Sequence, residues 1–174
     1  KNSFTEVFWV YDKEYLADYV GPQGQNIFVR PNQIIACSLE YSPLSDEMKR
    51  TVLDVVTREL LTPRGLRTLS PKNPLYKGLY GGDQPIRDEA YHQGTVWPWL
   101  TGPYIEANFR LYGKAFVPTA KELVAGFEED MTLYGICSIS EVYDGNPPYQ
   151  PNGCISQAWS VGEILRALAL IEKY

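Results

Sequence analysis

The sequence predicts an all-α protein whose helices form two concentric layers, an α/α toroid. Several segments, about five, carry apolar residues at helical spacing. They alternate between helices that are apolar nearly all round, which belong in a buried inner layer, and amphipathic helices, which suit an outer layer. Two long segments without periodicity separate them, and these are rich in glycine, proline and aromatic residues. We expect these two loops to gather at one end of the toroid.

The N-terminal part is aromatic and irregular, and predicts only short strands, over residues 15–20 and 25–29. A first helix is expected over residues 32–42, where Pro43 ends it. Ser45 is a good N-cap for a second helix, because anionic side chains follow it in the first turn and the helix dipole favours them there. We expect this helix to end near residue 62.

Residues 63–94 show no sustained period and form the first long loop, which is longer than connections within compact domains usually are. The third helix, over residues 95–112, is apolar nearly all round and ends at Gly113. Pro103 should kink this helix or mark its true beginning. The fourth helix, residues 116–134, has an apolar stripe and a charged face.

The second long loop covers residues 136–156, and Ser156 is expected to cap the last helix. The overall length, 174 residues, suits one domain with a sizeable core. The net charge of −5 leaves no basic stripe for nucleic acid, and no apolar run is long enough to cross a membrane.

The chain has three cysteines, Cys37, Cys137 and Cys154, without metal-ligand spacing, and one histidine, so we expect no zinc site and no cofactor. Such cysteines are typical of reduced thiols in the cytoplasm. Lys1 opens the chain without an initiator methionine or the apolar core of a signal peptide. We therefore expect a piece of a longer cytoplasmic protein.

Residues 91–99 read YHQGTVWPW and contain the only histidine and two of the four tryptophans. We interpret this segment as a sugar-binding wall, although single histidines and tryptophans are more often core residues. Trp97 and Trp99 lie two residues apart at an expected helix start, so they should not share one face, and at most one should reach a ligand. The groups expected to bind sugar hydroxyls are Tyr91, His92, Gln93 and Thr95.

Glu141 stands among small and apolar residues just past the fourth helix. A carboxylate held there by neighbouring hydroxyls can stay ionised and polarise a water molecule. The alternative is structural: Glu141 caps a turn or pairs with an arginine. Residues 144–146, Asp-Gly-Asn, are expected to form a plain turn. Residues 87–89, Arg-Asp-Glu, are expected to form a local ion pair.

Several motifs, in their order along the chain, resemble the C-terminal amylo-α-1,6-glucosidase domain of glycogen debranching enzymes, over roughly residues 25–170. The motifs are RPNQ (30–33), GLRTL (65–69), YHQGTVWPW (91–99), Ser140-Glu141 and GCISQAWS (153–160). The resemblance implies an (α/α)6 barrel that hydrolyses α-1,6-linked glucose at glycogen branch points with inversion. The implied partner is therefore glycogen or another branched α-glucan.

An inverting site needs an acid for the leaving oxygen and a base for the water, held ~6.5–9.5 Å apart. Glu141 matches the family's general base. The family's general acid is an aspartate in the N-terminal half of the barrel, and no residue here matches it. Asn32 and Gln157, which lie in matching motifs, join Tyr91, His92, Gln93, Thr95 and Trp97 as the expected substrate-binding residues.

Residues 1–174 are thus expected to be the C-terminal portion of one toroid glycosidase domain, inactive without the rest of the polypeptide. The helix face left uncovered would favour self-association. Two other interpretations stay open. The chain could belong to a toroid glycosidase with a different glycoside specificity, or it could be a catalytically silent carbohydrate-binding module.

Overall fold

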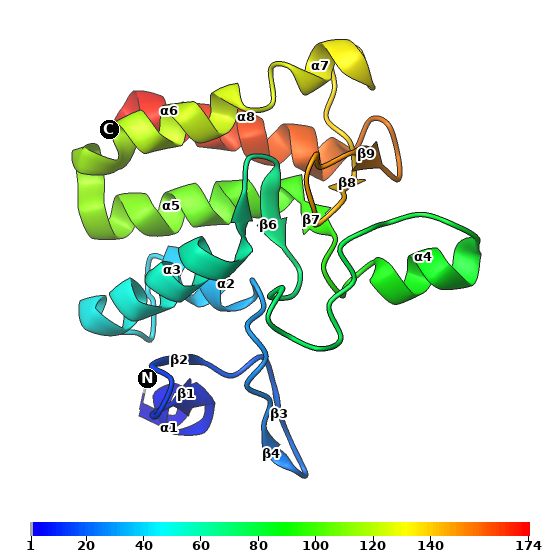
Figure 1. Cartoon of the computed structure of the whole chain (residues 1–174). Coiled ribbons are helices and arrows are strands. Elements are labelled where there is room, and N and C mark those ends of the chain that lie inside the picture. The colour runs from blue at the N-terminus through cyan, green and yellow to red at the C-terminus, as the bar shows by residue number, and fades with distance from the viewer. Residues whose placement is uncertain (1) are drawn as a thin grey trace.

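The chain is not all-α: helices alternate with short antiparallel strands in the computed structural model, which describes residues 2–174 (Figure 1). The helices are α1 (Asn2–Phe8), α2 (Gln33–Ser38), α3 (Asp46–Leu60), α4 (Gln84–Ala90), α5 (Thr101–Tyr112), α6 (Val117–Ala125), α7 (Asp130–Leu133) and α8 (Ala158–Lys173), with 3-10 turns η1 (Pro98–Leu100) and η2 (Gly113–Phe116). The predicted all-α toroid of about five helices was therefore wrong.

A five-stranded antiparallel sheet overturns that prediction, with the order β5-β6-β7-β8-β9. Its strands are β5 (Leu61–Thr62), β6 (Gly65–Arg67), β7 (Val96–Trp97), β8 (Val142–Tyr143) and β9 (Pro151–Asn152). Strands of two or three residues are too short to show an alternating pattern, so the sequence carries no period that identifies them. They exist because distant segments pair, as Leu66 does with Trp97 and Val96 with Tyr143.

The N-terminal segment folds into two further antiparallel pairs, which partly match the expected strands. β1 (Trp9–Val10) pairs with β2 (Tyr15–Leu16), and β3 (Val20–Gly21) pairs with β4 (Gly24–Gln25).

α5 lies at the centre of the fold, in contact with α2, α3, α6 and α8. Tyr104 and Ala107 enter one hydrophobic core with α2 and α3, and Ile105 and Phe109 enter a second core with α6 and α8. This double burial explains why the helix is apolar nearly all round. It begins at Thr101, so Pro103 falls in its first turn. Pro103 therefore marks the true beginning of the helix, as one of the two predicted alternatives stated, rather than a kink within it.

The five-stranded sheet extends from β6, at the centre of Figure 1, towards β9 on the right, where α3 ends and where α5 and α8 begin. β7 leads through η1 into α5, and β9 is followed by α8, so the sheet joins the segments that precede these helices. The two long loops thus meet at one end of the helices, as expected, although the fold is not an all-α toroid.

Capping residues in the sequence predicted where two helices begin or end, whereas the predicted lengths of other helices were less accurate. The Ser45 hydroxyl accepts a hydrogen bond from the Met48 amide at 3.3 Å, and Gly113 ends α5 with a φ of +55°. The predicted fourth helix is instead broken between Ala125 and Asp130. The last helix begins at Ala158 after Gln157, rather than at Ser156. No helix within residues 2–174 is long and apolar enough to cross a membrane.

Candidate active site

Glu141 is held from two sides, directly before β8. The Cys154 amide donates to its Oε2 at 2.9 Å, and the Tyr91 hydroxyl donates to its Oε1. The Glu141 amide donates in turn to the Cys154 carbonyl at 2.9 Å, which ties the residue to the segment that follows β9. Within residues 2–174 the carboxylate forms no ion pair, so the arginine-paired alternative is not what the chain adopts.

Tyr91 connects this carboxylate to the aromatic residues behind it. It ends α4, where its amide donates to the Arg87 carbonyl at 3.0 Å. Its ring packs edge-on against His92 and Trp97, each with a centroid distance of 4.8 Å. Burial, and then the hydrogen bond to Glu141, raise the pKa of Tyr91 above its usual value of 10.0. The phenol therefore stays protonated at neutral pH and remains a donor to Glu141.

An aromatic wall stands beside Tyr91. The His92 ring stacks on Trp97 at 5.5 Å with an interplanar angle of 10°, and Trp159 lies 5.6 Å from Trp97 and 6.0 Å from Trp99. These rings enclose a cavity of about 200 Å³, here called the tryptophan pocket, lined by Pro31, Asn32, Thr68, His92, Trp97, Trp99, Leu100 and Trp159. Pockets that bind small molecules are typically apolar with a few polar groups, as this one is.

Trp97 and Trp99 thus line the same pocket, so the expectation that they could not share a face was wrong. Trp97 belongs to an extended strand and Trp99 to the following 3-10 turn, where helical spacing does not apply. Trp97 itself is buried, and its indole N–H donates to the Tyr91 carbonyl at 3.1 Å.

Arg30 joins three distant parts of the chain at the edge of this wall. Its guanidinium donates to the carbonyls of Thr68 at 3.0 Å and His92 at 2.5 Å, and to the Gln93 side chain at 2.7 Å. Its Nε lies 3.4 Å from the Asp18 carboxylate. The planar fork of arginine suits such a role because it presents several donors in fixed directions.

A second cavity of about 400 Å³ opens around Arg30, bordered by Asp18, Tyr19, Asn32, His92 and Gln93 among others. Asn32, Thr68 and His92 also line the tryptophan pocket, so the two cavities adjoin. The Asn32 amide donates to Asp18 at 2.7 Å. Burial and the Arg30 charge lower the pKa of His92 below 6.5, so its ring is neutral at pH 7.

Not all predicted binding residues face these cavities. Thr95 is fully buried, and its hydroxyl donates to the Ala90 carbonyl at 2.8 Å, which shapes the loop rather than the wall. Gln157 is half-buried before α8, and its backbone N–H, not its side chain, donates to the Ile139 carbonyl at 3.0 Å. Asn32, His92, Gln93 and Trp97 line cavities, whereas the Tyr91 hydroxyl is taken by Glu141.

Asp144 does more than form a turn. Its buried carboxylate accepts from the Tyr80 amide at 2.8 Å and from the Asn152 side chain at 3.2 Å, and burial raises the pKa of Asp144 above 3.8. It thereby anchors the first long loop to the second. The expected local pair in residues 87–89 is also absent, since Arg87 donates to the Gly82 carbonyl at 2.7 Å and Glu89 pairs with Lys77.

Arg30, Trp159 and Asp18 belong to this site but were not selected from the sequence. Arg30 and Trp159 lie inside the RPNQ and GCISQAWS motifs, so the motifs contain the signal even though spacing alone does not reveal it. Asp18 lies in the irregular N-terminal segment and has no such signal.

Comparison with known proteins places the chain in a family. A glycogen debranching enzyme of Saccharomyces cerevisiae is 28% identical over 100 residues, which cover 54% of this chain and 6% of that protein. The neutral trehalase Nth1 from Saccharomyces cerevisiae superposes with a TM-score of 0.68 at 14% identity, over 97% of this chain and 28% of that one. This likeness shows a shared fold, and the chain spans under a third of either relative.

The sequence matches the amylo-alpha-1,6-glucosidase family over residues 1–166, which is nearly its whole length. The motifs on which the resemblance rested therefore reflect true membership, and the chain belongs to the amylo-alpha-1,6-glucosidase family.

Proposed function

We propose that this chain supplies the general-base half of an inverting glycoside hydrolase site that removes α-1,6-linked glucose at branch points of glycogen. The observation that carries the proposal is the held carboxylate of Glu141, fixed by Tyr91 and Cys154 beside the aromatic wall. Family membership supports the reaction class, because the family is named for this glucosidase activity.

Glu141 acts as the base in this proposal. A general base must be ionised and must hold its water in a fixed direction. The donors on Glu141 occupy one position on each oxygen, and each carboxylate oxygen has further lone-pair sites for a water. When the water attacks the anomeric carbon, its proton passes to Glu141, and the leaving oxygen takes a proton from the general acid.

The general acid lies elsewhere in the polypeptide in this proposal, since Asp144, the buried acid nearest in sequence, is used by Tyr80 and Asn152. The chain is then the C-terminal portion of a glycosidase domain, and its partners are the remaining polypeptide and a branched α-glucan. In this proposal the tryptophan pocket offers aromatic faces against which a sugar ring of the glucan packs.

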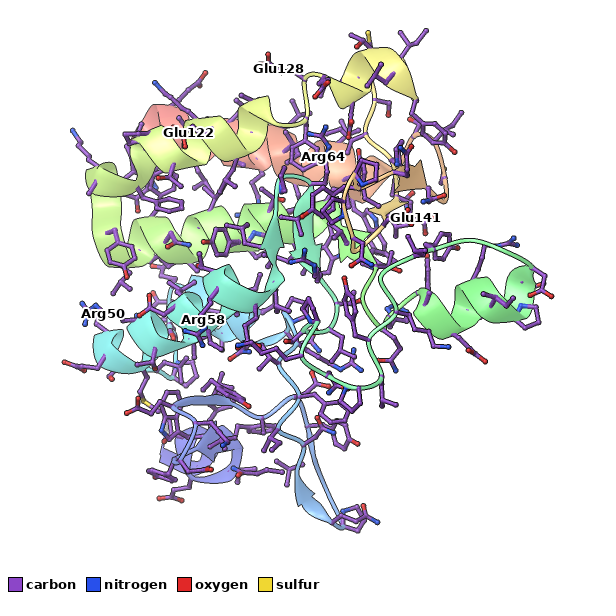
Figure 2. The ribbon with its side chains drawn as sticks, in the orientation of Figure 1. Arg50, Arg58, Arg64, Glu122, Glu128 and Glu141 are labelled. Carbon is purple, nitrogen blue, oxygen red and sulfur yellow. The ribbon has the colours of Figure 1, made fainter. Side chains whose placement is uncertain are left out.

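The test is Glu141→Gln in the polypeptide that contains this chain, with glucose release from a branched dextrin as the readout. We expect a loss of about 100-fold or more, because general-base catalysis contributes that much, with glucan binding retained. Glu128→Gln is the matched control, since Glu128 is exposed beyond α6 and away from Glu141 (Figure 2). Unchanged hydrolysis in Glu141→Gln would make Glu141 a structural residue and remove the proposal.

Substrate choice is tested separately by comparing isomaltosides, maltooligosaccharides and mannosides. Release from α-1,6-linked glucose alone supports branch-point hydrolysis. Preference for another glycoside would keep the glycosidase and replace its substrate, and binding without hydrolysis of any of them would favour a silent binding module.

A further inference from the structure

A separate cavity of about 360 Å³ lies on the far part of the β8–β9 hairpin, formed with α7. We call it the hairpin pocket, and the residues used here are Arg64, Glu129, Asp130, Tyr134, Tyr149 and Gln150. It shares none of its lining residues with the tryptophan pocket or the cavity around Arg30. Its volume falls within the range of pockets that bind small ligands.

The charge in this pocket is arranged around Arg64. The Arg64 Nε lies 3.0 Å from the buried Asp130 carboxylate, Nη2 lies 3.5 Å from Glu129, and Nη1 donates to the Gly126 carbonyl. Two carboxylates thus offset one guanidinium, so the pocket does not suit an anion such as phosphate. Arg64 is fixed by these contacts, in the position between α6 and the hairpin that Figure 2 shows.

The remaining lining groups combine ring faces with uncommitted polar atoms. Tyr134 is 43% exposed, and Tyr149 is half-buried with the Arg67 guanidinium 5.9 Å from its ring centre. The side chain of Gln150 is exposed, and no hydrogen bond holds it within residues 2–174. Tyrosine rings with an amide and carboxylates beside them offer an apolar face together with hydrogen-bonding groups, which is what a neutral, hydroxyl-rich ring requires.

The position of the pocket relates it to Glu141. Tyr149 and Gln150 immediately precede β9, and the same short strand leads into Cys154, whose amide holds the Glu141 carboxylate. The Asp144 amide donates to the Gln150 carbonyl at 3.0 Å, which fixes the pocket side of the hairpin to the Glu141 side. A chain bound in the hairpin pocket would therefore lie on the same hairpin as the proposed base.

We propose that the hairpin pocket is a second α-glucan-binding site, which holds an outer chain of the same branched polysaccharide whose branch point is presented to Glu141. This inference rests on the proposed function for its choice of ligand. Two sites on one polymer raise the effective concentration of the second contact, so the pocket should favour large branched glucans over short ones.

The test measures binding of maltohexaose and of glycogen to Glu141→Gln protein, so that hydrolysis plays no part. In that background Tyr134→Ala and Gln150→Ala should weaken glycogen retention in affinity electrophoresis about tenfold or more. They should also abolish the maltohexaose-induced NMR shifts of residues 148–151. Tyr41→Ala, at an exposed tyrosine on the α2 side of the molecule, is the matched control and should change neither result.

Catalysis then separates the two proposals. With Glu141 intact, Tyr134→Ala should raise KM for glycogen and leave kcat and the rate on a short branched oligosaccharide unchanged. Unaltered glycogen binding in both pocket variants overturns the second site, whatever Glu141→Gln does to hydrolysis. Loss of the shifts with Tyr134→Ala upholds the site even if Glu141 proves structural.

Discussion

Tyr91 and Glu141 depend on each other. The phenol donates to the Glu141 carboxylate and holds it in place, and burial together with this hydrogen bond raises the pKa of Tyr91 and keeps the phenol protonated. The residue first assigned to sugar binding thus serves to position the proposed base. Its ring also forms the support against which His92 and Trp97 pack.

Tyr91→Phe should keep the ring packing and remove only the donor. Because Glu141 then loses one of the two donors that hold its carboxylate, kcat should fall several-fold, with KM little changed. Tyr80→Phe is the control, since its ring lies 5.7 Å from Tyr91 while the side-chain donors to Glu141 within residues 2–174 do not include its hydroxyl. An unchanged kcat in Tyr91→Phe would show that Tyr91 does not position the base.

His92 gives a direct test of the electrostatics of the wall. Burial, and then the charge of Arg30, disfavour the imidazolium, so its pKa lies below 6.5. Because the unfolded chain binds a proton at His92 more readily than the folded chain, folding stability is full above pH 6.5 and decreases as the pH falls towards the lowered pKa. As the chain has one histidine, NMR titration reports it without ambiguity, and a midpoint at or above 6.5 would contradict the position of the ring stacked on Trp97 beside Arg30.

At the scale of elements, the β8–β9 hairpin and residues 153–154, which follow β9, position Glu141. Gly153 lies where this segment turns back against Glu141, with φ +71°, and a Cβ built there would stand 2.5 Å from Oε2. The close approach of backbone to carboxylate therefore requires glycine on both steric and conformational grounds.

Gly153→Ala and Gly24→Ala form a matched pair. Both positions have positive φ, so each substitution should cost about 1–2 kcal/mol of folding stability. A Cβ at Gly24 meets nothing within 4 Å, whereas one at Gly153 displaces the Glu141 carboxylate. Thermal unfolding should therefore show a loss in both variants, at least as large in Gly153→Ala, while glucose release should fall only in Gly153→Ala. Equal activity in the two variants would mean that Glu141 tolerates displacement.

At the scale of the whole molecule, Arg30 joins three segments that are distant in sequence. Through it the N-terminal segment at Asp18, the segment after β6 at Thr68 and the loop at His92 meet. None of these segments is adjacent in sequence, and each contributes to one of the two adjoining cavities.

Arg30→Lys should keep the positive charge near Asp18 but lose the forked donors. We expect KM for a branched dextrin to rise several-fold with a smaller change in kcat, because the wall shifts while Glu141 keeps its own donors. Arg58→Lys, at an arginine whose side chain is 62% exposed, is the control. If KM is the same in both variants, Arg30 does not organise the wall.

Local signals in the sequence predicted the features that depend on neighbouring residues. The Ser45 cap, the Gly113 end of α5 and the burial of α5 on two sides follow from side chains within a few positions of each other. The motifs likewise identified the family and brought Glu141 and the segment 91–99 forward as one site.

Only the tertiary structure decided the sheet, the role of Tyr91 and the pockets. Strands of two residues have no period, and a hydroxyl bonds to whichever group lies within reach, so Tyr91 pairs with Glu141 across 50 positions. The sequence by itself determined which residues can form helices, caps and a carboxylate site. The contacts between distant segments determined which of those residues meet, because such contacts depend on how the whole chain packs.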